Sequence, residues 1–193
     1  MLDAARVLDG RKCARQKYAA LIYTLTFTGC RIGEALALRW QDIDLLGGTI
    51  SINHSVSRSG TLTAPKTRAG VRTVPIPDLL LTVLVEHKPL DAEDGSFVFP
   101  ARHGGGPLSY WNVRERGWAE TLKIAGLSDK GITVHDLRHC AASALISAGL
   151  SPVQVAGQLG HANARVTMSV YARAFDRSSA DEKVRAAFAT VAA

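Results

Sequence analysis

The chain has 193 residues, of which 47% are hydrophobic and 21% are charged. A chain of this length buries roughly two thirds of its unfolded surface, so a single folded domain is expected. No apolar run approaches the roughly 20 residues that cross a membrane, and the N-terminus lacks the basic start and apolar core of a signal peptide. The 23 lysines and arginines exceed the 17 acids, which suits an anionic partner, and we expect no membrane partner.

The three cysteines, Cys13, Cys30 and Cys140, are widely spaced. They are too few for a disulfide framework, and no Cys-x-x-Cys pair suggests a metal site. A reducing cytoplasm is therefore the expected setting.

The first part of the chain predicts two helices and a turn. Apolar residues recur at helical spacing over residues 2–8 and 16–28, and Gly29 ends the second helix. The turn at 28–31 then brings Arg31 to the start of a new helix, one turn before Glu34. Arg31 can bind an anion there or pair with Glu34, and Glu34 can do both jobs by fixing an arginine that binds.

A small sheet is predicted next. Residues 47–57, 61–65 and 71–76 alternate between apolar and polar side chains and are separated by turn residues. They predict three strands of one antiparallel sheet, with Lys66 near the tip of a hairpin. A hairpin lysine is commonly only a solvated charge that protects a sheet edge.

The second half of the chain predicts only helices. Apart from the helix expected at 162–173, each begins at a residue typical of a helix N-terminus and carries apolar residues along its length. The expected ranges are 77–86, 109–125, 133–148, 151–159, 162–173 and a last helix from residue 178 or 179. The predicted fold class is therefore α+β, mainly helical with a small three-stranded antiparallel sheet.

The stretch 133–139, Thr-Val-His-Asp-Leu-Arg-His, is the strongest candidate for chemistry. His135 and Arg138 lie three residues apart and share a face at a helix start, where free N–H groups and the helix dipole add to the guanidinium charge. We expect them to face outward and bind a phosphodiester. His161 follows the glycine that ends the next helix, and Tyr171 lies ten residues further on. A tyrosine there is otherwise an ordinary core residue.

A set of residues resembles the catalytic domain of the tyrosine recombinases, the phage integrase family, in order and spacing: Arg31, Lys66, His135, Arg138, His161 and Tyr171. The most specific segments are Thr-Gly-Cys-Arg-Ile-Gly-Glu-Ala-Leu at 28–36, His-Asp-Leu-Arg-His at 135–139 and Leu-Gly-His at 159–161. The resemblance implies the catalytic-domain fold of that family. It also implies site-specific recombination by cleavage and rejoining of double-stranded DNA, without metal or nucleotide cofactor.

The resemblance further implies a role for each residue. Arg31, Arg138 and His161 would stabilise charge on the non-bridging phosphate oxygens. Tyr171 would form a 3′-phosphotyrosine intermediate, with His135 accepting its proton and Lys66 protonating the departing 5′ oxygen. Glu34 and His139 would support these groups.

For domain organisation, the resemblance implies a catalytic domain over 1–177 and a terminal helix over 178–193. This helix packs either on its own domain or on a neighbouring protomer. The family's N-terminal core-binding domain is expected to be absent, which makes the chain a catalytic fragment. The full-length protein is expected to form a tetramer on DNA, the fragment could be monomeric, and the origin is expected to be bacterial, phage or a mobile element.

Three other readings stay open. Residues 147–160 look like a helix-turn-helix, which would suit a DNA-binding module without catalysis. His135 and His139 lie four residues apart and His161 could add a third metal ligand, although Arg138 would repel a cation. A topoisomerase of type IB shares the tyrosine chemistry but needs no defined site.

Overall fold

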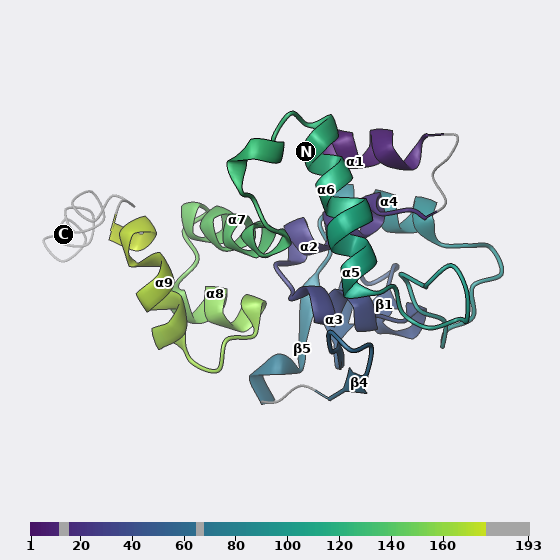
Figure 1. Cartoon of the computed structure of the whole chain (residues 1–193). Helices are drawn as coiled ribbons and strands as arrows, with labels where there is room; N and C mark the ends of the chain where they lie inside the picture. The colour runs from purple at the N-terminus through teal and green to yellow at the C-terminus, as the bar shows by residue number, and fades with distance from the viewer. Residues whose placement is uncertain (12–15, 65–67, 177–193) are drawn as a thin grey trace, which may run out of the picture.

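The computed structural model describes residues 1–11, 16–64 and 68–176 (Figure 1). Lys66, Cys13 and the predicted helix after residue 177 lie outside the described residues. The first half of the described chain contains α1 Leu2–Asp9, α2 Ala19–Thr28, α3 Ile32–Ala37, η1 Trp40–Asp42, β1 Ile43–Asp44, β2 Thr49–Ile52, β3 Ser55–Val56, β4 Leu62–Thr63, η2 Arg68–Gly70 and β5 Arg72–Pro75. The second half contains α4 Asp78–His87, α5 Tyr110–Asn112, η3 Val113–Trp118, α6 Ala119–Ile124, η4 Ser128–Lys130, α7 Val134–Ser147, α8 Pro152–Leu159 and α9 Ala164–Asp176.

Helix α2 lies near the middle of the molecule and packs against α1, α4 and α7. Seven of its ten side chains are aliphatic or aromatic and the other three are threonines, and all but two of its ten residues are buried. A helix that is apolar on every face is stable only inside a core, so the other elements assemble around it. The main core joins α2 to the inner face of the sheet and to α4 through Leu21, Leu25, Ile50, Val74 and Leu84.

The predicted start of α2 was wrong by three residues, for a reason that lies outside the helix. The backbone N–H groups of Tyr18 and Ala19 donate to the Asp9 carboxylate at 2.7 and 2.9 Å. Asp9, at the end of α1, thus satisfies the free donors at the start of α2 and sets where this helix begins.

A three-stranded antiparallel sheet is present, but its strands differ from those predicted. The order is β1-β2-β5, with Ile50 opposite both Ile43 and Val74. The predicted strand 47–57 divides into β2 and β3, and β3 pairs with β4 in a separate two-stranded sheet.

The division of that strand follows from a close approach to α3. A β-carbon on Gly33 would lie 2.5 Å from the Val56 carbonyl oxygen, so glycine is required where β3 crosses the helix. β3 makes this contact outside the first sheet, where it pairs with β4. Because Gly33 lies in the segment that contains Arg31, the crossing places β3 beside the predicted site.

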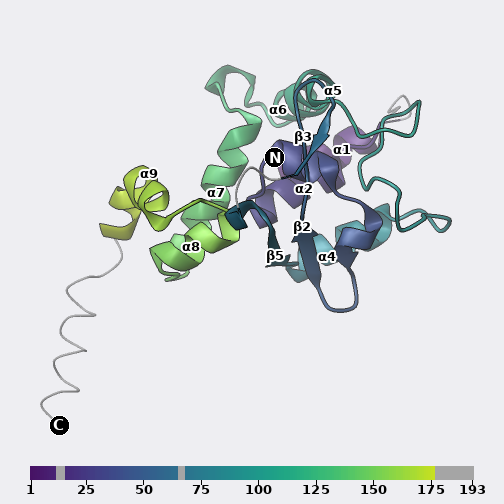
Figure 2. The same ribbon diagram turned by 90° about the horizontal axis from the view of Figure 1, so that it is seen from below.

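Helices α7, α8 and α9 gather at one side of the molecule, away from α4, and α8 lies beside β5, as Figures 1 and 2 show. Their shared core contains Ala142, Ile146, Val155, Leu159 and Tyr171. The predicted caps of α7 and α8 are confirmed, since Asp136 accepts from the Thr133 backbone and Ser151 from the Gln154 backbone. No helix in the described part of the chain is long and apolar enough to span a bilayer.

Candidate active site

Arg31 is the residue that caps α3. Two roles were predicted for its side chain, pairing with Glu34 and binding an anion, and its position allows both. Its backbone N–H donates to Glu34 Oε2 at 2.8 Å and its Nη1 donates to Glu34 Oε1 at 2.9 Å. The Glu34 side chain is only 6% exposed, whereas that of Arg31 is 46% exposed. Arg31 is therefore held by its partner and still open to an anion from solvent.

Glu34 has a second cationic partner that sequence reasoning missed. Arg72 Nη2 donates to Glu34 Oε2 at 2.8 Å. Burial acts to raise the pKa of Glu34, but the hydrogen bond and charge of Arg72, followed by the backbone and side-chain hydrogen bonds of Arg31, outweigh it and hold the pKa below its usual value. The carboxylate is thus ionised at neutral pH. No local signal marks Arg72, because an arginine in an alternating strand ordinarily faces solvent.

Arg138 is buried, with 4% exposed surface, and this corrects the expectation that it faces outward. Its Nη1 donates to the Gly29 carbonyl at 2.6 Å, and within the described chain its Nη2 has no hydrogen-bond partner. Burial, and then the positive charge of Arg31, lowers the pKa of Arg138 to about 10, so it remains protonated at neutral pH. A buried donor left unpaired costs about 1–3 kcal/mol, so an anion that reaches this group gains a strong partner.

His161 is set in place by the turn that ends α8. Gly160 has a left-handed φ of 69°, and the His161 backbone N–H then donates to the Ala156 carbonyl at 2.9 Å. The imidazole Nδ1 lies 2.7 Å from Thr167 Oγ1. When Nδ1 accepts from the threonine hydroxyl, Nε2 carries the proton and can donate to an anion.

The charge state of His161 follows from its surroundings. Burial, and then the positive charges of Arg138, Arg31 and Arg72, lowers the pKa of His161 to about 4. The imidazole is therefore neutral near pH 7, and it can stabilise an anion by donating a hydrogen bond rather than by its charge.

Tyr171 lies on α9 with its ring in the small core, and its hydroxyl is 2.7 Å from His139 Nδ1. The His139 ring in turn meets the His135 ring edge to face, with ring centroids 5.0 Å apart. The structure thus brings to the hydroxyl the histidine that was expected only to support the site, with His135 behind it. Burial raises the pKa of Tyr171, while the positive charge of Arg138 acts to lower it.

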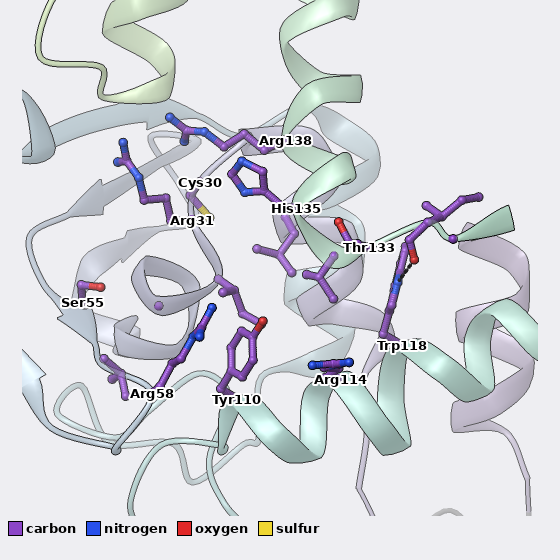
Figure 3. A pocket seen from close by; sticks show the side chains of 17 residues that line it. Cys30, Arg31, Ser55, Arg58, Tyr110, Arg114, Trp118, Thr133, His135 and Arg138 are labelled. Carbon is purple, nitrogen blue, oxygen red and sulfur yellow. Dashed lines mark hydrogen bonds between the residues drawn. The ribbon is translucent and has the colours of Figure 1, made fainter. Parts of the chain in front are cut away.

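A cavity of about 790 Å³ opens beside Arg31 and Arg138, and His135 also lines it (Figure 3). Its other end carries Arg58, Tyr110 and Arg114. The described residues that line it include four arginines and no aspartate or glutamate. Tyr171 and His161 are not among them. The cavity is suited to an anion with apolar parts, such as a segment of nucleic-acid backbone with its sugars.

Two further predictions concern Lys66 and a metal site. Lys66 lies outside the described residues, so its role as the proton donor stays a prediction. Among the described residues, no three histidine, cysteine, aspartate or glutamate side chains are grouped so that they could hold a metal ion.

The fold is shared with solved recombinase structures. A Tn1549 transposon integrase in complex with transposon right end DNA has a TM-score of 0.74 at 24% identity, covering 98% of this chain and 63% of that one. The XerA recombinase has a TM-score of 0.65 at 19% identity, covering 98% and 62%. The fold is that of tyrosine recombinase catalytic domains, as predicted.

The family follows from sequence. A family model described as the phage integrase family matches residues 1–178, and the chain belongs to this family. Prophage integrase IntR of Escherichia coli (strain K12) is 28% identical over 82% of this chain and 43% of its own length. The integrase of Staphylococcus phage L54a is 31% identical over 82% of this chain and 48% of its own length. The chain thus spans about half the length of the curated relatives it matches.

Proposed function

We propose that this chain carries the active site of a site-specific DNA recombinase, which cleaves and rejoins DNA strands through a phosphotyrosine intermediate. The observation that carries the proposal is the buried guanidinium of Arg138, whose Nη2 has no hydrogen-bond partner among the described residues. It lines a cavity with Arg31, and no carboxylate of the described residues lines that cavity. This arrangement is suited to bind a phosphodiester, whose non-bridging oxygens gain negative charge in the transition state. Membership of the phage integrase family supports the same chemistry.

In the proposed reaction the Tyr171 oxygen attacks phosphorus and its proton passes to a histidine. The bond between phosphorus and the 5′ bridging oxygen breaks, leaving a 3′-phosphotyrosine. Lys66 gives a proton to the departing oxygen, so that a free 5′ hydroxyl results. Arg31, Arg138 and His161 donate hydrogen bonds to the non-bridging oxygens throughout. Rejoining is the same step in reverse, and it needs no external energy source.

The proton acceptor is the role on which geometry bears most directly. His135 remains the residue that the family resemblance favours. His139 is the imidazole within hydrogen-bonding distance of the hydroxyl, and we propose that it takes the proton first, with His135 as its neighbour. A general base must be within reach of the proton it removes, which supports this order.

We propose double-stranded DNA as the partner. The Tn1549 integrase to which this chain is similar in fold was determined with DNA, and the four arginines of the cavity suit a phosphate backbone. We further propose that the full-length protein acts as a tetramer on DNA, with residues 178–193 as an element that packs in cis or on a neighbouring protomer.

The test is covalent capture. The chain is incubated with a library of nicked duplexes, and protein that carries DNA through a denaturing gel is collected, with and without EDTA. We expect an adduct in both conditions. Binding without any adduct would favour a helix-turn-helix module. Loss of the adduct in EDTA would favour the metal site. Relaxation of a plasmid without sequence preference would favour a topoisomerase.

A further inference from the structure

Arg72, in β5, donates hydrogen bonds to oxygen atoms of three separate segments. Its Nη2 bonds Glu34 Oε2 in α3 at 2.8 Å, its Nε bonds the Gln158 carbonyl near the end of α8 at 2.9 Å, and its Nη1 bonds the Gly70 carbonyl at 3.2 Å. The side chain is 7% exposed. A guanidinium that is closed off from solvent and bonded through all three nitrogens is not placed to bind a phosphate itself.

Two of these segments carry groups of the proposed site. Glu34 bonds Arg72 through one oxygen and Arg31 Nη1 through the other, so the carboxylate joins the two guanidiniums. Because Glu34 is buried, loss of either cation would leave its charge poorly compensated, and the carboxylate would reorient or take up a proton.

The other contact is with the turn before His161. A β-carbon on Gly160 would lie 2.5 Å from Arg72 Nη1, so the guanidinium fits against the turn where a side chain is missing. The Gly160 carbonyl also accepts from Arg31 Nη1 and Nη2 at 3.4 and 3.5 Å. Arg31 and Arg72 therefore enclose the turn that orients the imidazole.

We propose that Arg72 is a positioning residue. It fixes Arg31 by way of Glu34, and it fixes His161 by way of the turn at Gly160, so that both side chains can donate hydrogen bonds to one phosphate. The inference rests on the proposed function for its catalytic consequence. It assigns the alignment of two groups from distant parts of the chain to a single buried arginine.

The experiment compares two versions of one nicked duplex, selected by covalent capture with the wild-type 193-residue chain. One carries the normal scissile phosphate, and the other carries a methylphosphonate, in which a methyl group replaces a charged oxygen. Arg31 stabilises charge on that oxygen, so Arg31→Ala should be slowed much more on the phosphate than on the methylphosphonate. Replacing a residue that only positions Arg31 should also slow the reaction more on the phosphate than on the methylphosphonate, but by a smaller factor.

We expect Arg72→Ala to slow adduct formation roughly 10- to 100-fold on the phosphate, the range for a displaced catalytic group, and much less on the methylphosphonate. Arg72→Lys should form the adduct at a rate between those of the wild type and Arg72→Ala, because an ammonium keeps the charge but not the paired hydrogen bonds of a guanidinium. The control is Arg39→Ala, which removes another side chain bonded to a backbone carbonyl, that of Gly95, away from the cavity. It should not change the ratio between the substrates. An equal loss on both substrates for Arg72→Ala and Arg72→Lys would mean a merely structural role and would overturn the proposal.

A second measurement needs no cleavage. In protein labelled with ¹⁵N-arginine, the guanidinium resonances of Arg31 should move or broaden in Arg72→Lys and stay in place in Arg39→Ala. Unchanged Arg31 resonances in Arg72→Lys would refute the positioning role. If the wild-type chain captures no DNA, the proposed function fails, and these resonances still decide whether Arg72 holds Arg31.

Discussion

Arg31 caps α3 and Glu34 lies in it, and α3 packs on α2 and β3 in the larger core. Tyr171 lies instead on α9, which packs on α7 and α8 around a smaller core. Glu34 is bound by two arginines at 2.8 and 2.9 Å. The Tyr171 hydroxyl has instead a hydrogen bond to one histidine side chain. The proposed phosphate-binding side is thus joined by ion pairs, whereas the proposed nucleophile is buried in the smaller core and its hydroxyl bonds a histidine.

This difference indicates how the two sides serve one reaction. Stabilising a transition state requires donors that are already in place, because reorganising them during the reaction would cost free energy. In the proposed reaction Tyr171 has to attack, leave and attack again, and such a group gains from a position that opens at low free energy. The predictions that follow vary one side at a time.

The largest expected effect is on the nucleophile side. Tyr171→Phe removes only the hydroxyl, so it should abolish the covalent adduct while DNA binding, measured by gel shift, is retained. The matched control is Tyr110→Phe, since Tyr110 lines the cavity, whereas Tyr18 and Tyr23 are buried in the core. An adduct that persists in Tyr171→Phe and disappears in Tyr110→Phe would identify Tyr110, which lines the cavity, as the nucleophile.

On the phosphate-binding side, Arg138→Met should slow cleavage by roughly 10²- to 10³-fold, the loss typical of a removed transition-state donor. It should not lower the free energy of unfolding, because removing a buried charge offsets the lost bond to Gly29, and Arg138 Nη2 bonds no other group in the described part of the chain. Arg31→Ala should lose similar activity but also stability, since Glu34 loses a partner. Denaturant unfolding measures the stability of both variants. A strongly destabilised Arg138→Met would contradict the expected difference between the two arginines.

A smaller effect is expected at the histidine that holds the nucleophile. His139→Ala should slow adduct formation by about 10²-fold, the lower end for a general base. The defect should shrink as the pH rises, because tyrosinate then forms without help. The burial-raised pKa of Tyr171 places that recovery above the usual tyrosine range. If His135→Ala recovers with pH and His139→Ala does not, His135 is the acceptor.

The smallest effect concerns pH and stability. His161 has a pKa of about 4 in the folded chain, against 6.5 for an unperturbed histidine. Between these values the unfolded chain binds the proton and the folded chain does not, so the free energy of unfolding falls as the pH drops from 6.5 to 4. Above pH 6.5 both states are neutral and His161 contributes nothing. His161→Gln should show a shallower fall in this window, and identical curves would contradict the depressed pKa.

Much of the architecture could be predicted because its causes are local. Thr133 and Asp136 cap α7 across three residues, Ser151 and Gln154 do so for α8, and a glycine ends each of α2 and α8. The sheet was harder. Its alternating pattern indicated strands but not their partners, and the contact of Gly33 with β3 decided that strand 47–57 would divide.

By itself, the sequence determined which residues head which helices, the family, and the set of arginines, histidines and tyrosine worth testing. The tertiary structure decided how they meet. Arg72 joins Glu34 across 38 residues, His139 joins Tyr171 across 32, and Arg138 joins Gly29 across 109. Caps depend on neighbours along the chain, whereas the burial of Arg138 and the partner of Tyr171 depend on how α2, α7 and α9 pack, and that packing is set by the whole core.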